Sequence, residues 1–181
     1  MANSETAKHD AIVDEVRSAF GAALLDVDRS YDDLALVVDK SAVHDVLAHL
    51  RKARKCNLLL DIAGIDCMDL PDPRTRFELE YILYSVPDNV RVRVRVPVPE
   101  EDMDVPTATD LWQSANWAER EAFEMFGFNF VGHPCLKRLL THHEFQGHPL
   151  RKDYPTMGGQ WCTTTSVMTE ELQEEQGGAP E

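Results

Sequence analysis

Four histidines in one short stretch of the chain could bind a metal ion. They are His133, His142, His143 and His148, with Glu144 beside them. Imidazole is the commonest protein ligand for transition metals. Adjacent histidines on one element point apart, however, and the outer two each stand in a Gly-His-Pro turn. No metalloenzyme spacing such as His-Glu-x-x-His occurs. We therefore expect these histidines to lock turns by hydrogen bonding to backbone groups or carboxylates. A stand-alone metal-dependent enzyme built on them is kept as an alternative.

Other catalytic motifs are missing from the sequence. It contains no glycine-rich phosphate loop and no nucleophile elbow. Cys56, Cys67, Cys135 and Cys162 are scattered, without the close Cys-x-x-Cys pair typical of zinc and iron–sulfur sites. We predict reduced cysteines that act as small hydrophobic residues. The expected role of the chain is therefore binding and positioning, with no cofactor and no metal of its own.

Composition limits the class of protein. The 181 residues are enough for one well-buried core. A net charge of −14 argues against binding to nucleic acid, which needs a basic surface. No apolar run approaches the roughly 20 residues of a membrane-spanning helix, and the first residues lack the pattern of a secretory signal. We expect the protein to begin in the cytosol after synthesis and not to insert directly into the membrane.

A small cationic region stands out on this acidic chain. Between residues 127 and 155 the sequence contains four basic residues and only two acidic ones. The basic residues are Lys137, Arg138, Arg151 and Lys152, and each pair follows a Gly-His-Pro turn. We predict that this region is a docking edge for a specific partner. The basic cluster at 51–55, with Arg51 and Lys52, is instead expected to be the solvated end of a helix.

The element that must position this region is a helix starting at Asn116. Asn116 can cap its N-terminus, with Glu119 reaching back in a capping box. Gly127 stands where a left-handed C-terminal cap is expected, followed by an apolar contact from Phe128. A turn of about 100° per residue places an apolar face on one side of this helix. That face contains Ala118, Ala122, Phe123, Met125 and Phe126.

The charged residues of this helix divide between its two sides. Arg120, Glu121 and Glu124 fall on the other face, with Arg120 and Glu124 spaced for a side-chain pair. Glu119 lies inside the apolar arc and needs a partner to remain charged there. Two partners are open: the backbone amide of Asn116 in the capping box, or an arginine from downstream, Arg138 or Arg151.

The rest of the chain alternates helices and strands. Apolar spacing predicts a helix over 7–23 and a second one capped by Ser41, with Val43, Val46, Leu47 and Leu50 inward. Strands are expected at 34–38 and at 58–62, where Gly64 then turns the backbone. In a hairpin over 76–98, matching the buried faces requires paired residue numbers with an odd sum, for example Leu83 with Val92 or Tyr81 with Val94. Its arginine row beside Glu78 and Glu80 is expected to be tied to those carboxylates on a solvated face, although it could grip an anion.

This order of elements predicts an α+β fold in two layers, with helices on one face of a small mixed β-sheet. An acidic connector over 98–106 leads into the helix at 116. We expect residues 1–155 to form a single domain with the helix and cationic segment at 116–155. Residues 156–181 are expected to be an acidic, flexible C-terminal tail with few apolar anchors.

The segments 118–140 and 147–155 resemble the signature of one family, the C subunits of bacterial NADH:quinone oxidoreductase (respiratory complex I). The matching positions are Glu119, Arg120, Glu121, Phe126, Gly127, Gly132, His133, Pro134, Lys137, Arg138, Gly147, His148, Pro149, Leu150, Arg151, Lys152, Asp153, Tyr154 and Pro155. We take these, apart from Leu150, Tyr154 and Pro155, as the candidate docking residues. The sequence departs from the signature at Cys135 and at Glu124, where aspartate is common.

The resemblance implies a two-layer fold and a non-redox subunit of the peripheral arm of a proton-translocating enzyme. Its chief partner would be the quinone-site subunit. FMN and iron–sulfur clusters would lie in partner subunits, and electrons would pass from NADH to a quinone such as ubiquinone. The protein would be peripheral, on the cytoplasmic side of the cell inner membrane. Related membrane-bound hydrogenases and ferredoxin:quinone oxidoreductases have an equivalent subunit, which stays an alternative.

Overall fold

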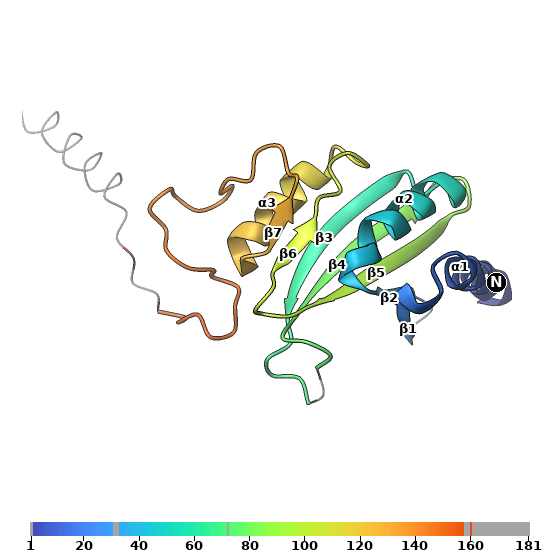
Figure 1. Ribbon diagram of the computed structural model, residues 1–181, viewed down its shortest axis with the longest axis horizontal. Coiled ribbons are helices and arrows are strands. Elements are labelled where there is room, and N and C mark those ends of the chain that lie inside the picture. The colour runs from blue at the N-terminus through green and yellow to red at the C-terminus, as the bar shows by residue number, and fades with distance from the viewer. Residues whose placement is uncertain (1, 31–32, 72, 158–159, 161–181) are drawn as a thin grey trace, which may run out of the picture.

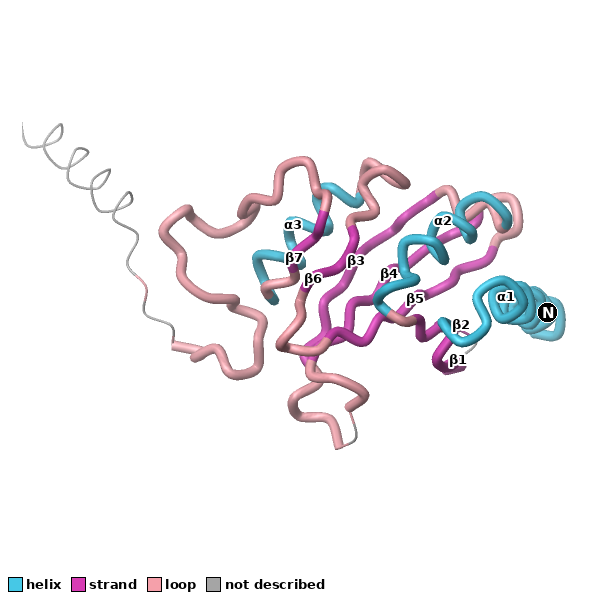
Figure 2. The backbone as a smooth tube through the Cα atoms, in the orientation of Figure 1, coloured by secondary structure: helices cyan, strands magenta, loops and turns pink. Residues whose placement is uncertain are grey.

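The computed structural model describes residues 2–30, 33–71, 73–157 and 160. The predicted tail at 156–181 lies almost entirely outside these residues. Within them, three α-helices lie against one five-stranded sheet (Figures 1 and 2). The helices are α1 (Ala2–Phe20), α2 (Val43–Ala53) and α3 (Ala115–Phe126), and short 3-10 turns occupy Gly21–Ala23 and Lys40–Ala42.

The main sheet has the strand order β1-β2-β5-β4-β3. Its strands are β1 (Leu24–Ser30), β2 (Asp33–Val38), β3 (Leu58–Asp66), β4 (Phe77–Ser85) and β5 (Val90–Val98). The β2–β5 pair is parallel and the other neighbours are antiparallel. Leu83 lies opposite Val92 and Tyr81 opposite Val94, so the predicted hairpin register is confirmed. The mixed sheet covered by helices confirms the α+β prediction.

Two small features of the fold were not predicted. β1 carries Asp26 and Asp28, and because aspartate is depleted in strands, the local signal for this strand was weak. The connector after β5 contains β6 (Asp104–Pro106), which pairs in parallel with β7 (Asn129–Val131). This second sheet joins the segment that leads into α3 to the segment that follows α3.

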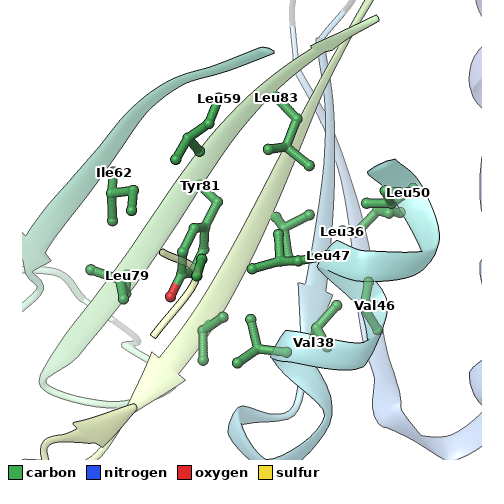
Figure 3. Close-up of a cluster of buried hydrophobic side chains, with 14 of the residues drawn as sticks. Leu36, Val38, Val46, Leu47, Leu50, Leu59, Ile62, Leu79, Tyr81 and Leu83 are labelled. Atoms are coloured by element: carbon green, nitrogen blue, oxygen red, sulfur yellow. The ribbon is translucent and has the colours of Figure 1, made fainter. Parts of the chain in front are cut away.

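The core lies between the helices and the inner face of the sheet. Leu47 and Leu50 of α2 pack toward Leu36 of β2, with Tyr81 of β4 in the same cluster (Figure 3). The predicted inward residues of α2, Val43, Val46, Leu47 and Leu50, are all buried. The predicted cap at Ser41 is wrong, because α2 begins after Ala42, which makes no side-chain cap. Asp39 instead caps the 3-10 turn before α2: its Oδ1 accepts a hydrogen bond from the Ser41 amide at 2.9 Å.

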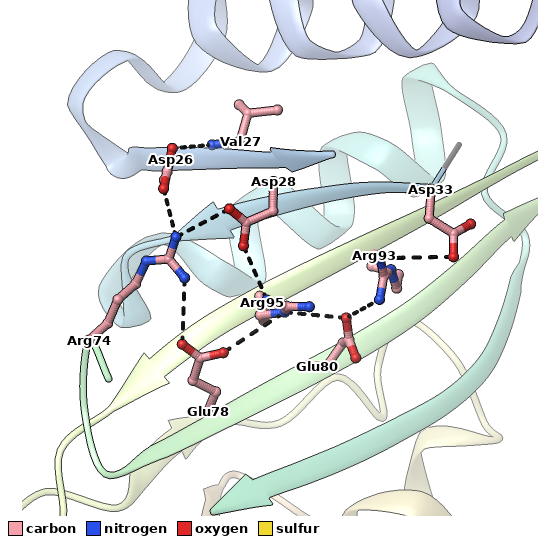
Figure 4. A network of polar contacts seen from close by, with 9 residues as sticks. All are labelled: Asp26, Val27, Asp28, Asp33, Arg74, Glu78, Glu80, Arg93 and Arg95. Carbon is pink, nitrogen blue, oxygen red and sulfur yellow. Dashed lines mark hydrogen bonds and ion pairs between the residues drawn. The ribbon is translucent and has the colours of Figure 1, made fainter. Parts of the chain in front are cut away.

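The outer face of the sheet carries a network of charged side chains (Figure 4). Arg95 lies 3.4 Å from a carboxylate oxygen of Glu80 and 3.1 Å from one of Asp28. Arg74 and Arg93 extend the network to both sides. Arg93 and Arg95 of the arginine row are therefore tied to carboxylates, as predicted. Glu78 and Glu80 are only 6% and 8% exposed, so this face is less solvated than expected.

Gly64 does not turn the backbone, which corrects the prediction. β3 continues through Gly64 to Asp66. A Cβ built at Gly64 would lie 2.4 Å from Cδ2 of Phe126, far inside van der Waals contact. The missing side chain thus lets α3 approach β3 closely, one of the recognised uses of glycine inside a strand.

We expect Gly64→Ala to destabilise the protein by about 1–3 kcal/mol, because an extra methyl must displace a packed ring. Urea unfolding measures this. Phe126→Leu supplies room, so the double variant should lose clearly less free energy of unfolding than the sum of the two single losses. Simple additivity of the two losses would contradict this account of Gly64.

Candidate docking site

The C-terminal end of helix α3 agrees with the prediction, and its N-terminal end does not. Gly127 adopts φ 90° and its amide donates to the Phe123 carbonyl at 2.9 Å, which confirms the C-terminal cap. At the other end, Ser114 precedes the first helical residue and makes no side-chain cap. Its Oγ donates to the Leu59 carbonyl of β3 at 3.3 Å. The predicted capping box at Asn116 is therefore wrong.

Glu119 is fully buried, as predicted, but its partners are different. Its Oε2 accepts from the Thr107 hydroxyl at 2.6 Å, and its Oε1 accepts from the Ala108 amide at 2.6 Å. Neither Arg138 nor Arg151 reaches it, so the predicted arginine pair is wrong. Burial raises the pKa of Glu119 to about 7, although the two hydrogen bonds oppose that rise. The side chain thus fastens α3 to the segment that follows β6.

Glu124 is the residue that sequence reasoning missed. The helical wheel placed it on the solvated face, paired with Arg120, but its side chain is fully buried. Its Oε2 accepts from the amides of Leu139 and Leu140 at 2.6 and 2.8 Å, and its Oε1 accepts from the Thr141 amide at 2.5 Å. The chain after β7 folds over Glu124 and buries its side chain.

The pKa of Glu124 reflects these donors. Burial by itself would raise it, but the hydrogen bonds from Thr141 and from the amides of Leu140 and Leu139 outweigh burial and lower the pKa to about 2. The carboxylate is therefore charged at neutral pH. Hydrogen bonds to a charged acceptor are stronger than neutral ones, so Glu124 is a firm anchor for the segment it holds.

We call residues 132–157 the C-terminal arm. It contains no helix or strand and runs beside α3 (Figures 1 and 2). Arg120 holds its first part from the helix side: Nε donates to the Lys137 carbonyl and Nη2 to the Arg138 carbonyl, both at 2.9 Å. Arg120 and Glu124 thus bind the arm and do not pair with each other.

The second part of the arm covers the C-terminal end of α3, whose last carbonyls have no partner within the helix. His148 Nδ1 lies 2.9 Å from the Glu124 carbonyl, and the Leu150 amide donates to the Met125 carbonyl. Arg151 Nε donates to the Phe126 carbonyl at 2.6 Å. Burial and the nearby arginines lower the pKa of His148, so its ring is neutral and Nδ1 is the donor.

A charged clamp holds the end of the arm against the main sheet. Arg76, just before β4, lies 2.7 Å from an oxygen of Asp153 and 2.5 Å from one of Glu100. The guanidinium groups of Arg76 and Arg151 each lie 4.9 Å from the ring centre of Phe77. Arg151 therefore makes its contacts inside the chain, with Phe77 and the end of α3.

Two of the four histidines, His133 and His148, bond to the backbone as predicted, whereas the buried Nδ1 of His142 has no hydrogen-bond partner among the described residues. Nδ1 of His133 accepts from the Cys135 amide at 3.0 Å, and its Nε2 lies 3.3 Å from the Asn116 carbonyl, which places the proton on Nε2. With His148, this confirms the prediction that the two Gly-His-Pro histidines bond to the backbone. Among the described residues, no three His, Cys, Asp or Glu side chains lie close enough together to hold a metal ion.

The outward surface of the arm combines apolar and cationic groups. Leu140 is 64% exposed and Leu150 is 53% exposed. Lys137 and Lys152 are exposed, and within the described ranges neither amino group has a hydrogen-bond or ion-pair partner. Arg138 lies over the Phe145 ring and near the Thr141 hydroxyl. Of the four predicted docking cations, the structure thus leaves the two lysines available to another molecule.

The comparisons with known proteins agree on one family. Residues 36–160 match the family described as respiratory-chain NADH dehydrogenase, 30 kDa subunit. The C subunit of the NADH-quinone oxidoreductase of Citrifermentans bemidjiense is 40% identical over 152 residues, which cover 84% of this chain and 92% of that protein. The corresponding C subunit of Thermus thermophilus is 47% identical over 134 residues, covering 71% of this chain and 64% of that protein.

Two solved structures share the fold. A trypsin-resistant fragment of Nqo5 matches with a TM-score of 0.62 and 40% identity, covering 69% of this chain and 99% of the fragment. A chain from the membrane-bound sulfane sulfur reductase, an archaeal respiratory membrane complex, matches with a TM-score of 0.67 over 92% of both chains. At 20% identity, the second likeness concerns the fold alone. No helix in the described part of this chain is long and apolar enough to cross a membrane.

Proposed function

The chain belongs to the C-subunit family of NADH-quinone oxidoreductases, the family of the 30 kDa subunit of respiratory-chain NADH dehydrogenase, and on that premise we propose that it is a non-redox docking subunit. It would assemble into the peripheral arm of a proton-translocating NADH:quinone oxidoreductase, on the cytoplasmic side of the membrane. Its contribution to electron transfer from NADH to quinone is to hold partner subunits in place. FMN and iron–sulfur clusters belong to those partners.

The C-terminal arm is the observation that carries this proposal. A segment of this length without secondary structure is uncommon in a compact domain and is usually functional. Here it is held by Glu124, Arg120 and Arg151, while Leu140 and the two free lysines face outward. A partner with acidic or carbonyl groups around an apolar centre fits that surface, and the quinone-site subunit is the partner we propose.

The related assemblies have less support. The relatives at 36–47% identity are NADH-quinone oxidoreductase subunits, which favours that assembly over a hydrogenase or a ferredoxin-linked enzyme. A stand-alone metal enzyme gains no support, because His133 and His148 are bound to the backbone.

The lysines provide the test. We expect Lys137→Ala with Lys152→Ala to leave the thermal midpoint of the isolated chain within about 1 °C, because exposed charges without partners contribute little stability. The same double variant should deplete the assembled complex and its membrane NADH:quinone activity together, since losing one member of a desolvated pair costs about 2–5 kcal/mol of binding. Native gels and activity assays on membranes measure both.

Arg51→Ala with Lys52→Ala is the matched control, because both side chains lie on the exposed end of α2. It removes the same charge and should leave assembly intact. Loss of assembly in this control together with normal assembly in the lysine variant would place the docking surface elsewhere.

A further inference from the structure

β3 forms one edge of the main sheet, and no described residue adds a strand to its outer side. The Cys67 amide donates to the Arg76 carbonyl across the β3–β4 pair. Backbone groups of successive residues in an antiparallel strand point alternately to either side. Ile62, Gly64 and Asp66 therefore point their amides and carbonyls outward. In agreement, the Ile62 amide donates to the carboxylate of its neighbour Asp61 at 2.8 Å.

A groove of about 160 Å³ follows this edge. β3 forms one wall, α3 forms the other, and Leu150 of the arm closes one side. The lining residues are Asp61, Ile62, Ala63, Gly64, Glu121, Ala122, Met125, Phe126 and Leu150. Gly64 contributes to the lining of the groove, with the ring of Phe126 packed close against it. Leu60, which is 54% exposed, and Leu150 add apolar surface beside the groove.

The charge of the groove is negative. Asp61 and Glu121 are both exposed, one from each wall. Within the described residues neither forms an ion pair, and the Asp61 carboxylate contacts only the Ile62 amide. The groove thus offers backbone donors and acceptors that have no strand partner in the described residues, an apolar floor and two carboxylates without an ion-pair partner there.

We propose that this groove receives an extended segment of another subunit, which adds a strand to the outer edge of β3. Backbone hydrogen bonds supply affinity in such strand addition, and alternate side chains supply specificity. The segment should carry apolar side chains toward Met125 and Leu150 and basic side chains toward Asp61 and Glu121. The inference rests on the proposed function, because the segment comes from a partner in the same assembly.

Two other occupants are disfavoured by charge. Residues 161–181 of this chain contain five glutamates and no lysine or arginine, so they would be repelled by the groove. A second copy of the chain, paired edge to edge through β3, would bring a second Asp61 and Glu121 into the same place. A basic segment from a different chain has neither problem.

Hydrogen exchange tests the proposal directly. The isolated chain and the assembled complex, extracted from membranes, are compared by mass spectrometry over the peptides of β3. We expect the amides of Ile62, Gly64 and Asp66 to exchange at least about tenfold more slowly in the complex, because each is then held within a strand pair. The alternate amides already bond to β4, so they should change little. Equal exchange of the edge amides in both samples would overturn strand addition.

Charge reversal provides a second test of the proposal. Asp61→Lys with Glu121→Lys should reduce incorporation into the complex about tenfold, because like charges across an interface are costly. Asp14→Lys with Asp45→Lys makes the same charge change on exposed faces of α1 and α2 and should assemble normally. Equal incorporation of the two variants would count against a basic occupant.

The outcomes separate the two proposals. A wild-type chain that assembles normally but keeps fast edge exchange removes strand addition and leaves the docking function standing. A chain that never co-migrates with a large NADH-oxidising complex overturns both. Edge protection in the isolated chain that rises with its own concentration would identify a second copy as the occupant and would contradict the proposal.

Discussion

Glu124→Ala will detach the C-terminal arm from α3. The substitution removes the acceptor for three backbone amides, those of Leu139, Leu140 and Thr141. Charge-assisted hydrogen bonds are among the strongest in proteins, so we expect a loss of about 2–4 kcal/mol in the free energy of unfolding. We also expect rapid cleavage within 132–157 by a protease that leaves the wild-type arm intact. Urea unfolding and limited proteolysis measure the two effects.

Two variants sharpen this test. Glu121→Ala on the exposed face of the same helix should change stability by less than about 0.5 kcal/mol. Glu124→Gln keeps the volume of the side chain but turns an N–H toward a backbone N–H, so it should behave more like alanine than like wild type. An intact, protease-resistant arm in Glu124→Ala would show that the clamp around Arg76 holds the arm without Glu124.

The pH dependence of this anchor has a definite sign. The pKa of Glu124 is about 2 in the folded chain, below the ordinary value of 4.5. The unfolded chain therefore binds the proton first as the pH falls, and stability is lost between about pH 5 and pH 2. Glu124→Ala lacks this contribution, so the difference in stability between wild type and the variant should shrink over the same range.

Glu119→Ala is the second substitution that we expect to lower the stability of the protein strongly. It leaves the Ala108 amide and the Thr107 hydroxyl without their partner in the core and creates a cavity, which together cost about 2–4 kcal/mol. Measured at pH 5, the loss should far exceed that of Glu121→Ala. Similar small losses for the two variants would contradict the assigned contacts of Glu119.

Glu119→Gln separates the hydrogen bonds from the charge. Its amide can accept from the Ala108 amide and donate to the Thr107 hydroxyl, so both contacts survive. The pKa of Glu119 is about 7 in the fold, above the ordinary 4.5, so the unfolded chain loses its proton first as the pH rises. Wild type should therefore lose about 3 kcal/mol relative to Glu119→Gln between pH 4.5 and pH 8. Parallel stability profiles would refute this.

Local patterns determined much of the fold. The alternation of apolar residues in β4 and β5 set which face is buried, and a slip of one residue would have exposed that whole face. The pairing of Leu83 with Val92 is one of those that this alternation allows. The end of α3 at Gly127 also came from one residue type, because only glycine adopts its left-handed conformation without strain. The density of matching positions between 116 and 155 then identified the family.

Only the tertiary structure decided the partners of the charged side chains. Helical periodicity places Glu124 on the side away from the core, and nothing local shows that residues 139–141 return to cover it. The signature commonly has aspartate at this position, so the shared carboxylate was the one available signal. Glu119 likewise bonds to residues before the helix rather than after it. The predicted role of Gly64 was wrong because its missing side chain makes room for the ring of Phe126, which is distant in sequence.

The physical reason is the range of the interactions. Burial and backbone conformation repeat with the period of a helix or a strand, so they can be read from neighbouring residues. A carboxylate instead accepts from whichever donor, and a guanidinium donates to whichever acceptor, the folded chain brings within about 3 Å. Those contacts hold the arm on α3 and leave the edge of β3 open, and they exist only once the whole chain has folded.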